Sequence, residues 1–391
     1  MKARTAVAAA GVVLLVACID DAPSPVAPSA RNLSPTSLTN SEIVDGSIGP
    51  GSLYRLSRPA NWNGDLVIYA HGFVSPEQPV ALPPEADLFI SLFGAQGFAV
   101  AFSSFSENGW VIKDGAQRTH QLLGVFTSEF GKPNRVYLGG ASMGGLIAIK
   151  LAETYPTAYV GVVAACAAAG GTQRLYDYHA NVRALFDFFY PGVLPGNAAF
   201  LPNGTDINLQ IIAPAIAAMT LNPTPVLSIA LISQTPVPGA DGAELVQSIV
   251  TALAAHAFDL ANPLANGKPY FDNQSTVYSS AFLPPALLQA INAGVQRFSA
   301  SPAALASFAH NYTPTGDLRM PMVMLSNARD PVMPGYNQAS YLAAVTANGA
   351  SHLLVQRQVD VYGHCLFQPA EIGAAFTDLV LWVQFGIKPT P

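Results

Sequence analysis

The sequence predicts an α/β fold, a mainly parallel, doubly wound sheet with helices on both faces. Short apolar segments typical of buried strands recur at 65–70, 98–102, 135–138 and 159–166, with helical patterns between them. This alternation is typical of parallel sheets covered by crossover helices. It stops after residue 171 and resumes near residue 320. The core is therefore predicted in two parts, 47–171 and 318–391, separated by a largely helical insertion over 172–317.

The chain begins with a pattern typical of export signals. Lys2 and Arg4 precede an apolar run over 6–16 that is too short to span a bilayer as a mature helix. The run ends in Leu15-Val16-Ala17-Cys18, which resembles the lipobox of bacterial lipoproteins and implies lipidation of Cys18. Cleavage by an ordinary signal peptidase is the alternative. We expect a signal over 1–18, a Pro- and Ser-rich tether over 19–46, and an extracytoplasmic protein, lipid-anchored to the membrane or secreted.

The composition excludes several classes of protein. Of the 391 residues, 50% are hydrophobic and only 11% are charged, which argues against a disordered chain or a coiled coil. A net charge of −6 without a basic stripe argues against nucleic acid as a partner. The seven histidines and three cysteines show no metal-ligand spacing. No dinucleotide or phosphate loop is evident either, so neither a metal nor a cofactor is expected.

One motif carries the strongest chemical signal. Gly140-Ala141-Ser142-Met143-Gly144 lies between the strand at 135–138 and a helix predicted at 146–153. In that context Gly-x-Ser-x-Gly is typical of a nucleophile elbow, because the two glycines let strand and helix approach while the turn lifts the serine hydroxyl. The alternative is a glycine-rich turn without chemistry, since the pentapeptide alone is a weak signal.

Three further loops follow predicted strands. His71-Gly72-Phe73 follows the strand at 65–70, Asp330 follows the strand at 320–326, and His364 follows the strand at 352–361. With Ser142, these loops resemble the α/β-hydrolase family from Leu66 to Phe385. The resemblance implies Ser142 as nucleophile, His364 as base and Asp330 as the acid that orients it. It also implies an oxyanion hole formed by the backbone N–H groups of Phe73 and Met143. In that family an insertion at 172–317 implies a cap or lid, and a second helical layer that completes the core is the alternative.

Each of these roles has rivals in the sequence. Asp317 and Asp360 are alternative acids, but Asp317 precedes its predicted strand and Asp360 lies within one. His310 and His352 are alternative bases, placed at the end of a cap helix and at the start of a strand. His71 is interpreted as a structural residue of its turn, and His120 as a surface or partly packed histidine of a helix.

The His364-Cys365 pair is similar to one in the tannase and feruloyl esterase group. In that group a disulfide joins the cysteine after the histidine to one just before the nucleophile, but here that position is Ala141. Cys166 could replace it as the partner of Cys365 if the two Cα atoms come within about 7 Å. Two buried free thiols are the alternative. Because this position differs, the resemblance gives only weak support for assigning the substrate of tannases to this chain.

Together these patterns predict an exported serine hydrolase that cleaves carboxylic esters through an acyl-enzyme. The low charge and the aromatic cap favour small-molecule or polymeric esters with an apolar or aromatic acyl group. An exported serine peptidase of the same fold is the first alternative, although no acidic cluster for holding a substrate N-terminus is readable. A non-catalytic binding module is the second alternative.

Overall fold

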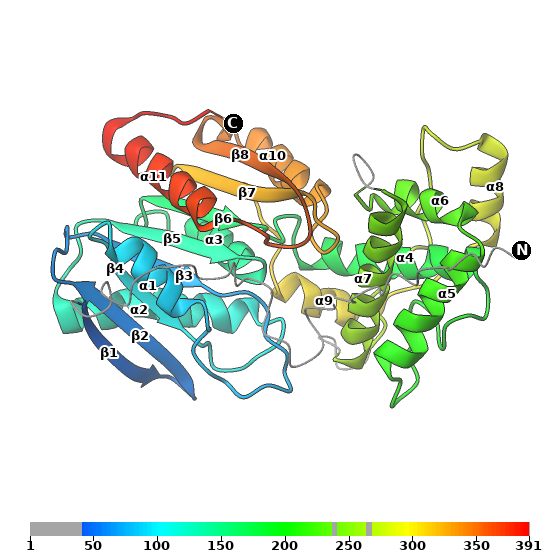
Figure 1. Ribbon diagram of the computed structural model, residues 1–391, viewed down its shortest axis with the longest axis horizontal. Coiled ribbons are helices and arrows are strands. Elements are labelled where there is room, and N and C mark those ends of the chain that lie inside the picture. The colour runs from blue at the N-terminus through cyan, green and yellow to red at the C-terminus, as the bar shows by residue number, and fades with distance from the viewer. Residues whose placement is uncertain (1–40, 237–240, 263–267, 391) are drawn as a thin grey trace, which may run out of the picture.

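The computed structural model describes residues 41–236, 241–262 and 268–390, and its centre is one eight-stranded sheet (Figure 1). The strand order is β1-β2-β4-β3-β5-β6-β7-β8; the strands from β4 to β8 are parallel, and β2 is antiparallel to both of its neighbours, β1 and β4. This confirms the predicted fold class, the α/β-hydrolase fold. The strands are β1 (Ser41–Ile48), β2 (Ser52–Pro59), β3 (Leu66–Ala70), β4 (Ala99–Ser103), β5 (Val136–Ala141), β6 (Gly161–Ala165), β7 (Met322–Arg329) and β8 (Leu354–Tyr362).

Helices bury both faces of the sheet. Along β3, Leu66 and Ile68 pack into the core on one face, whereas Val67 and Tyr69 pack into the core on the other. Successive side chains of a strand point to opposite faces of the sheet. Because both faces are buried here, apolar residues are needed at every position. The first face is covered by α2 (Ile112–Phe130), α3 (Met143–Thr154) and α10 (Tyr336–Ala347), and the second by α1 (Ala86–Gly94) and α11 (Pro369–Phe385).

The folded body begins earlier than the sequence predicts. The tether was expected to reach residue 46, but β1 starts at Ser41 and pairs in register with β2, from Ser41 opposite Pro59 to Ile48 opposite Ser52. β1 is an edge strand whose apolar side chains are only partly buried, so its sequence carries little periodic signal. The predicted signal, Cys18 and the rest of the tether lie outside the described residues.

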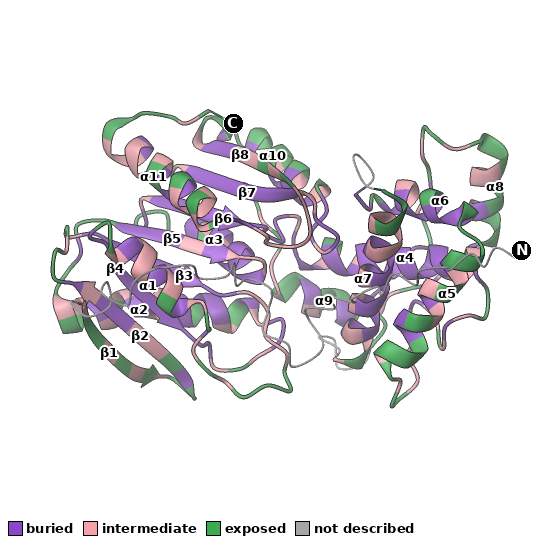
Figure 2. Ribbon diagram, viewed as in Figure 1, coloured by how far each residue is buried: buried purple, intermediate pink, exposed green. Residues whose placement is uncertain are grey.

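The insertion between β6 and β7 is helical and stands beside the sheet, on the right in Figure 1. Figure 2 shows that α4 is largely buried, whereas α5 and α8 carry many exposed residues. We call residues 172–317 the cap. Its elements are α4 (Thr172–Phe189), a π-helical turn η2 (Asn208–Ile212), α5 (Ala213–Leu221), α6 (Thr224–Ser233), α7 (Gly242–Ala261), α8 (Pro285–Gly294) and α9 (Pro302–His310).

Two further details concern the helices. Pro225 lies in the first turn of α6, where a missing N–H costs nothing, whereas Pro214 is the second residue of α5, which continues η2 directly. His352 lies in a short 3₁₀ turn, η3 (Ser351–Leu353), rather than in the strand that follows it. Among the described residues no single helix is long and apolar enough to span a bilayer. One pair of helices, 208–221 and 224–233, together has the required length and apolar composition, but the two are bent by 120° at the break between them.

Candidate active site

Ser142 occupies a strained turn between β5 and α3. Its backbone has φ 57° and ψ −121°, a conformation that residues with a side chain rarely adopt. A Cβ at Gly140 would lie 2.1 Å from the carbonyl oxygen of Gly144, and one at Gly144 would lie 2.0 Å from that of Ala70. The two glycines of the motif are therefore required by close backbone contacts, and the local geometry is that of a nucleophile elbow.

Three side chains from three loops form one hydrogen-bonded chain. His364 Nε2 lies 2.9 Å from Ser142 Oγ, and His364 Nδ1 lies 2.8 Å from Asp330 Oδ2. Asp330 is 1% exposed, and its Oδ1 accepts hydrogen bonds from the backbone N–H groups of Val332 and Met333, both at 2.9 Å. With Nδ1–H donated to the carboxylate, the tautomer leaves Nε2 free to accept a proton from the serine hydroxyl.

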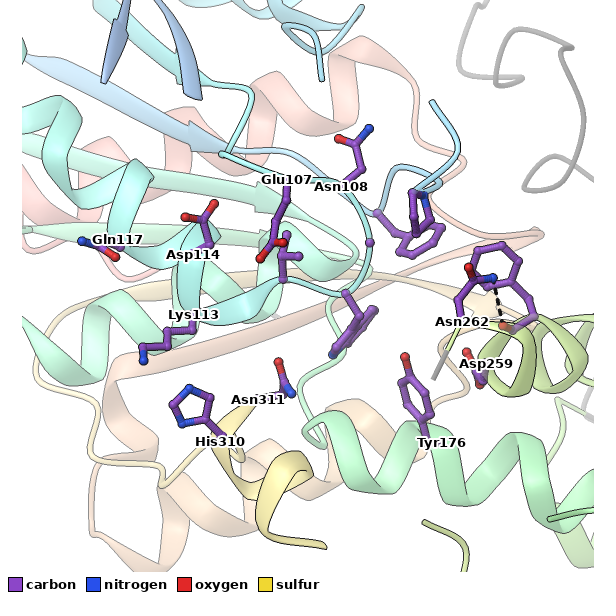
Figure 3. Close-up of a pocket in the computed structure, with 16 residues that line it drawn as sticks. Glu107, Asn108, Lys113, Asp114, Gln117, Tyr176, Asp259, Asn262, His310 and Asn311 are labelled. Carbon is purple, nitrogen blue, oxygen red and sulfur yellow. Dashed lines mark hydrogen bonds between the residues drawn. The ribbon is translucent and has the colours of Figure 1, made fainter. Parts of the chain in front are cut away.

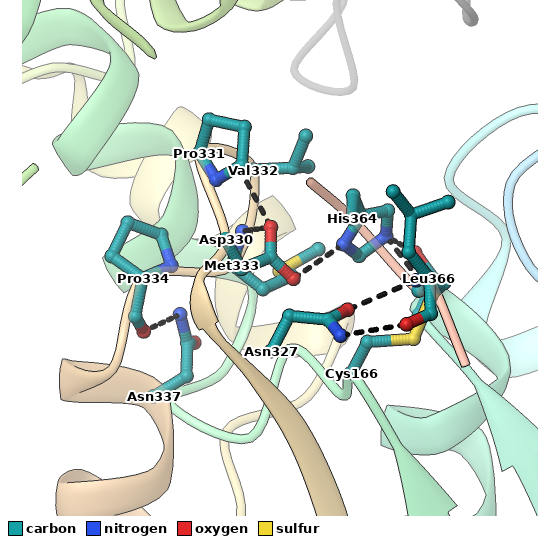
Figure 4. A network of polar contacts seen from close by, with 12 residues as sticks. Cys166, Asn327, Asp330, Pro331, Val332, Met333, Pro334, Asn337, His364 and Leu366 are labelled. Atoms are coloured by element: carbon teal, nitrogen blue, oxygen red, sulfur yellow. Dashed lines mark hydrogen bonds and ion pairs between the residues drawn. A yellow bond between two sulfur atoms is a disulfide. The ribbon is translucent and has the colours of Figure 1, made fainter. Parts of the chain in front are cut away.

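The loop that carries His364 is held to the core at two points (Figure 4). Cys365 forms a disulfide with Cys166, which follows β6, and their Cα atoms are 5.4 Å apart. Asn327, buried on β7, donates to the carbonyl of Leu366 and accepts from its N–H, both at 3.0 Å. Sequence reasoning missed Asn327, and its position inside an otherwise apolar strand is the signal that could have found it.

The candidate oxyanion donors lie beside Ser142. Met143 is the first residue of α3, so its N–H has no acceptor within the helix. A Cβ at Gly72 would lie 3.4 Å from Cβ of Ser142, which brings the turn containing Phe73 to the elbow. His71 is buried, stacks on Phe105 at 3.9 Å and has its pKa lowered to about 4 by burial. A neutral, enclosed His71 is a structural residue of this turn.

The residues considered as alternative acids and bases make their contacts away from Ser142. Asp317 pairs with Arg319 at 2.7 Å, and Asp360 pairs with Arg329. The carbonyl of His352 accepts a hydrogen bond from Lys388.

His310 and His120 are also away from the serine. His310 lines a cavity described below, and His120 lies 2.7 Å from the hydroxyl of Tyr159. None of the described contacts of these rival residues reaches Ser142.

One group of potential metal ligands is present among the described residues. Ligand atoms of Cys166, His364 and Cys365 lie within 4.8 Å of one another. The two sulfur atoms are bonded to each other, and a disulfide sulfur is not the thiolate that binds metals. The proximity of these three residues is therefore explained by the disulfide next to His364 and does not indicate a metal site.

A cavity of about 510 Å³ lies between the core and the cap (Figure 3). The ring of Phe73 forms part of its wall, so the cavity begins at the turn beside the elbow, although Ser142 itself is not in the wall. Aromatic rings of Trp110, Tyr176 and Phe258 line it together with the carboxylate of Asp259. None of these four residues was identified from the sequence, because nothing local distinguishes them from core residues.

Comparisons with known proteins bear on the fold only. No protein-family model and no curated protein matches the chain. Among solved structures, an esterase of Pyrococcus furiosus is 12% identical, with a TM-score of 0.45 over 89% of this chain and 94% of that one. Feruloyl esterase B of Aspergillus oryzae is 15% identical, with a TM-score of 0.49 over 88% and 81%.

A peptidase is among the similar structures too. Proline iminopeptidase of Mycobacterium smegmatis is 14% identical, with a TM-score of 0.43 over 88% of this chain and 99% of that one. At these identities and TM-scores the likenesses carry no conclusion about the activity of this chain. The substrate class has to be argued from the site.

Proposed function

We propose that this protein is a serine hydrolase that cleaves carboxylic esters through an acyl-enzyme on Ser142. The single observation that carries the proposal is the continuous hydrogen-bonded chain from Ser142 through His364 to Asp330. A serine hydroxyl becomes a useful nucleophile only when a base removes its proton during attack. His364 Nε2 is within hydrogen-bond distance of that proton.

In the proposed first step, Ser142 Oγ forms a bond to the ester carbonyl carbon while His364 Nε2 takes the hydroxyl proton. The N–H groups of Phe73 and Met143 stabilise the oxyanion, and Asp330 stabilises the imidazolium. The C–O bond to the alcohol then breaks, and His364 returns the proton to the departing oxygen. Water repeats the sequence on the acyl-enzyme, which releases the acid and restores Ser142.

The test is hydrolysis of a p-nitrophenyl ester series of increasing chain length, with Ser142→Ala and Ser128→Ala compared with the wild type. Ser128 is exposed on α2 and bonded only to its own helix, so it is a matched control. We expect Ser142→Ala to lower kcat by ~10⁴-fold or more and Ser128→Ala to leave it unchanged.

The two alternatives give different results in the same experiment. Labelling of Ser142 by a fluorophosphonate without turnover of any ester would favour an exported serine peptidase, to be tested with peptide substrates. Neither turnover nor labelling would contradict the proposed triad and leave a binding module.

We also propose export, with lipid attachment at Cys18. The pattern of Lys2, Arg4, the apolar run and the terminal cysteine supports it. Metabolic labelling with a fatty-acid analogue in a bacterial host should mark the wild type but not Cys18→Ser. Equal labelling of the two would refute the anchor, and a mature protein that begins elsewhere would favour ordinary secretion.

A further inference from the structure

Asp259 is a buried carboxylate with one oxygen unused. It lies near the end of α7 and is 8% exposed, yet it forms part of the cavity wall. Its Oδ2 lies 2.9 Å from His179 Nδ1, whereas Oδ1 accepts no hydrogen bond from any described residue. Burial raises the pKa of Asp259, and the hydrogen bond from His179 opposes that rise. A carboxylate removed from water is costly unless donors or a positive charge face it.

Among the described residues, His179 is the one whose side chain pairs with the carboxylate of Asp259. His179 is 4% exposed, and its Nε2 is buried without a hydrogen-bond partner in the described part of the chain. Lys113, which also lines the cavity, stands on the opposite side from Asp259 in Figure 3. Among the described residues that line the cavity, no lysine or arginine therefore contacts Asp259, and its Oδ1 stays available to a donor from a bound molecule.

Aromatic residues line the same cavity as Asp259. The ring of Phe258, the residue before Asp259, meets the ring of Phe73 edge to face at 5.4 Å between centroids. Trp110 and Tyr176 meet in the same way at 6.1 Å. All four rings line the cavity, and aromatic faces attract cations, most strongly where water is excluded. A carboxylate among aromatic rings suits a positively charged group better than a neutral one.

We propose that this cavity binds a positively charged ammonium group of the substrate, with Asp259 as its counter-ion. The inference rests on the proposed ester hydrolysis, because Phe73 connects the two sites. Its N–H is a candidate oxyanion donor, and its ring is part of the cavity wall. The substrate class is therefore an ester that carries an ammonium group on its acyl or alcohol portion.

The test compares cationic esters with neutral esters of the same shape. Butyrylcholine is paired with 3,3-dimethylbutyl butyrate for the alcohol portion. The p-nitrophenyl esters of 4-(trimethylammonio)butyrate and 5,5-dimethylhexanoate are paired for the acyl portion. In the wild type we expect kcat/KM of the cationic ester to exceed that of its neutral partner by about tenfold or more in one pair.

Two near-isosteric variants show whether Asp259 causes the preference for the cationic ester. Asp259→Asn should reduce the cationic-to-neutral ratio by about tenfold, since it removes the buried charge. Glu129→Gln is the control, because Glu129 is an exposed carboxylate on α2 that does not line the cavity, and it should change the ratio by less than about twofold. Thermal unfolding of both variants shows whether they are folded. A neutral ester preferred in both wild-type pairs, or a ratio untouched by Asp259→Asn, would overturn the inference.

A binding measurement separates this inference from the proposed function. Calorimetry of Ser142→Ala with tetramethylammonium should show binding that is lost in Ser142→Ala/Asp259→Asn. Binding without turnover of any ester would refute the proposed function and retain the cation site. Ester turnover without tetramethylammonium binding would overturn the cation site alone.

Discussion

Cys365, the residue after His364, is joined by a disulfide to Cys166, 199 residues earlier in the chain. Both cysteines have positive φ, 42° for Cys166 and 56° for Cys365. Their bond ties the loop of the candidate base to the end of β6, one strand away from the elbow. The disulfide therefore bears on the position of His364 as well as on the stability of the fold.

We expect loss of this disulfide to lower both stability and activity. The Cys166→Ala/Cys365→Ala variant should be destabilised by about 2–5 kcal/mol, because a long loop of the unfolded chain is no longer closed. Its kcat should fall roughly ten- to a hundredfold, since small displacements of a catalytic group are costly. Denaturant unfolding and ester kinetics measure the two effects. Wild type that is fully reduced, as judged by thiol counting, and still fully active would contradict the positioning role.

The carboxylate of Asp330 should be needed for activity rather than for folding. Asp330→Asn keeps Oδ1 as an acceptor for the N–H groups of Val332 and Met333 but presents N–H donors to His364, which favours the wrong tautomer. We expect kcat to fall by about 10⁴-fold with little loss of stability.

The rival acid supplies the control for that measurement. Asp360 has a side chain that is 84% exposed and pairs with Arg329. Asp360→Asn should leave kcat within about twofold of the wild type, since surface pairs contribute little. Loss of activity in Asp360→Asn with activity retained in Asp330→Asn would reverse the assignment.

The glycines of the elbow should not tolerate a methyl group. An added Cβ at Gly140 or Gly144 would meet backbone oxygens at 2.1 Å and 2.0 Å, which only a backbone shift could relieve. We expect Gly144→Ala to lower stability by about 2–4 kcal/mol and to lower ester turnover strongly. Gly124→Ala is the control, because Gly124 is an exposed residue of α2 and nothing lies within 4 Å of an added Cβ there. It should stabilise the protein by about 0.4–1 kcal/mol. Similar unfolding midpoints for the two variants would contradict this reading.

His71 should make the fold less stable in acid. Its pKa is about 4 when folded, because burial disfavours the charged ring, against 6.5 for an exposed histidine. Between these pH values the unfolded chain binds the proton and the folded chain does not. The contribution of His71 is therefore present above about pH 6.5 and is lost as the pH falls to 4, a change of about 3 kcal/mol.

Denaturant unfolding of wild type and His71→Gln at pH 7 and pH 5 measures this effect. Asp177 acts in the opposite direction, since burial raises its pKa to about 6 and the folded state gains a proton as the pH falls. The comparison of the two proteins removes that contribution, which they share. We expect the wild type to lose more stability than His71→Gln over this pH range, and equal losses would show that His71 is not held neutral.

The sequence by itself determined the fold class and the order of the chemical groups. Ser142, Asp330 and His364 could be named because each directly follows a strand, and the carboxyl ends of parallel strands meet at one edge of a sheet. The spacing of Gly140 and Gly144 around Ser142 could be interpreted for a similar reason, since the steric requirement of that turn is local. The edge strand β1 was missed, because its half-exposed side chains leave only a weak pattern.

Only the tertiary structure decided the rest. The distance between Cys166 and Cys365 depends on how β6 and the β8 loop lie together, which no local pattern encodes. The same holds for Asp259, whose burial and unused oxygen arise where the cap meets the core. Residue type and strand order are properties of short segments, whereas proximity and burial depend on the packing of segments far apart in the chain.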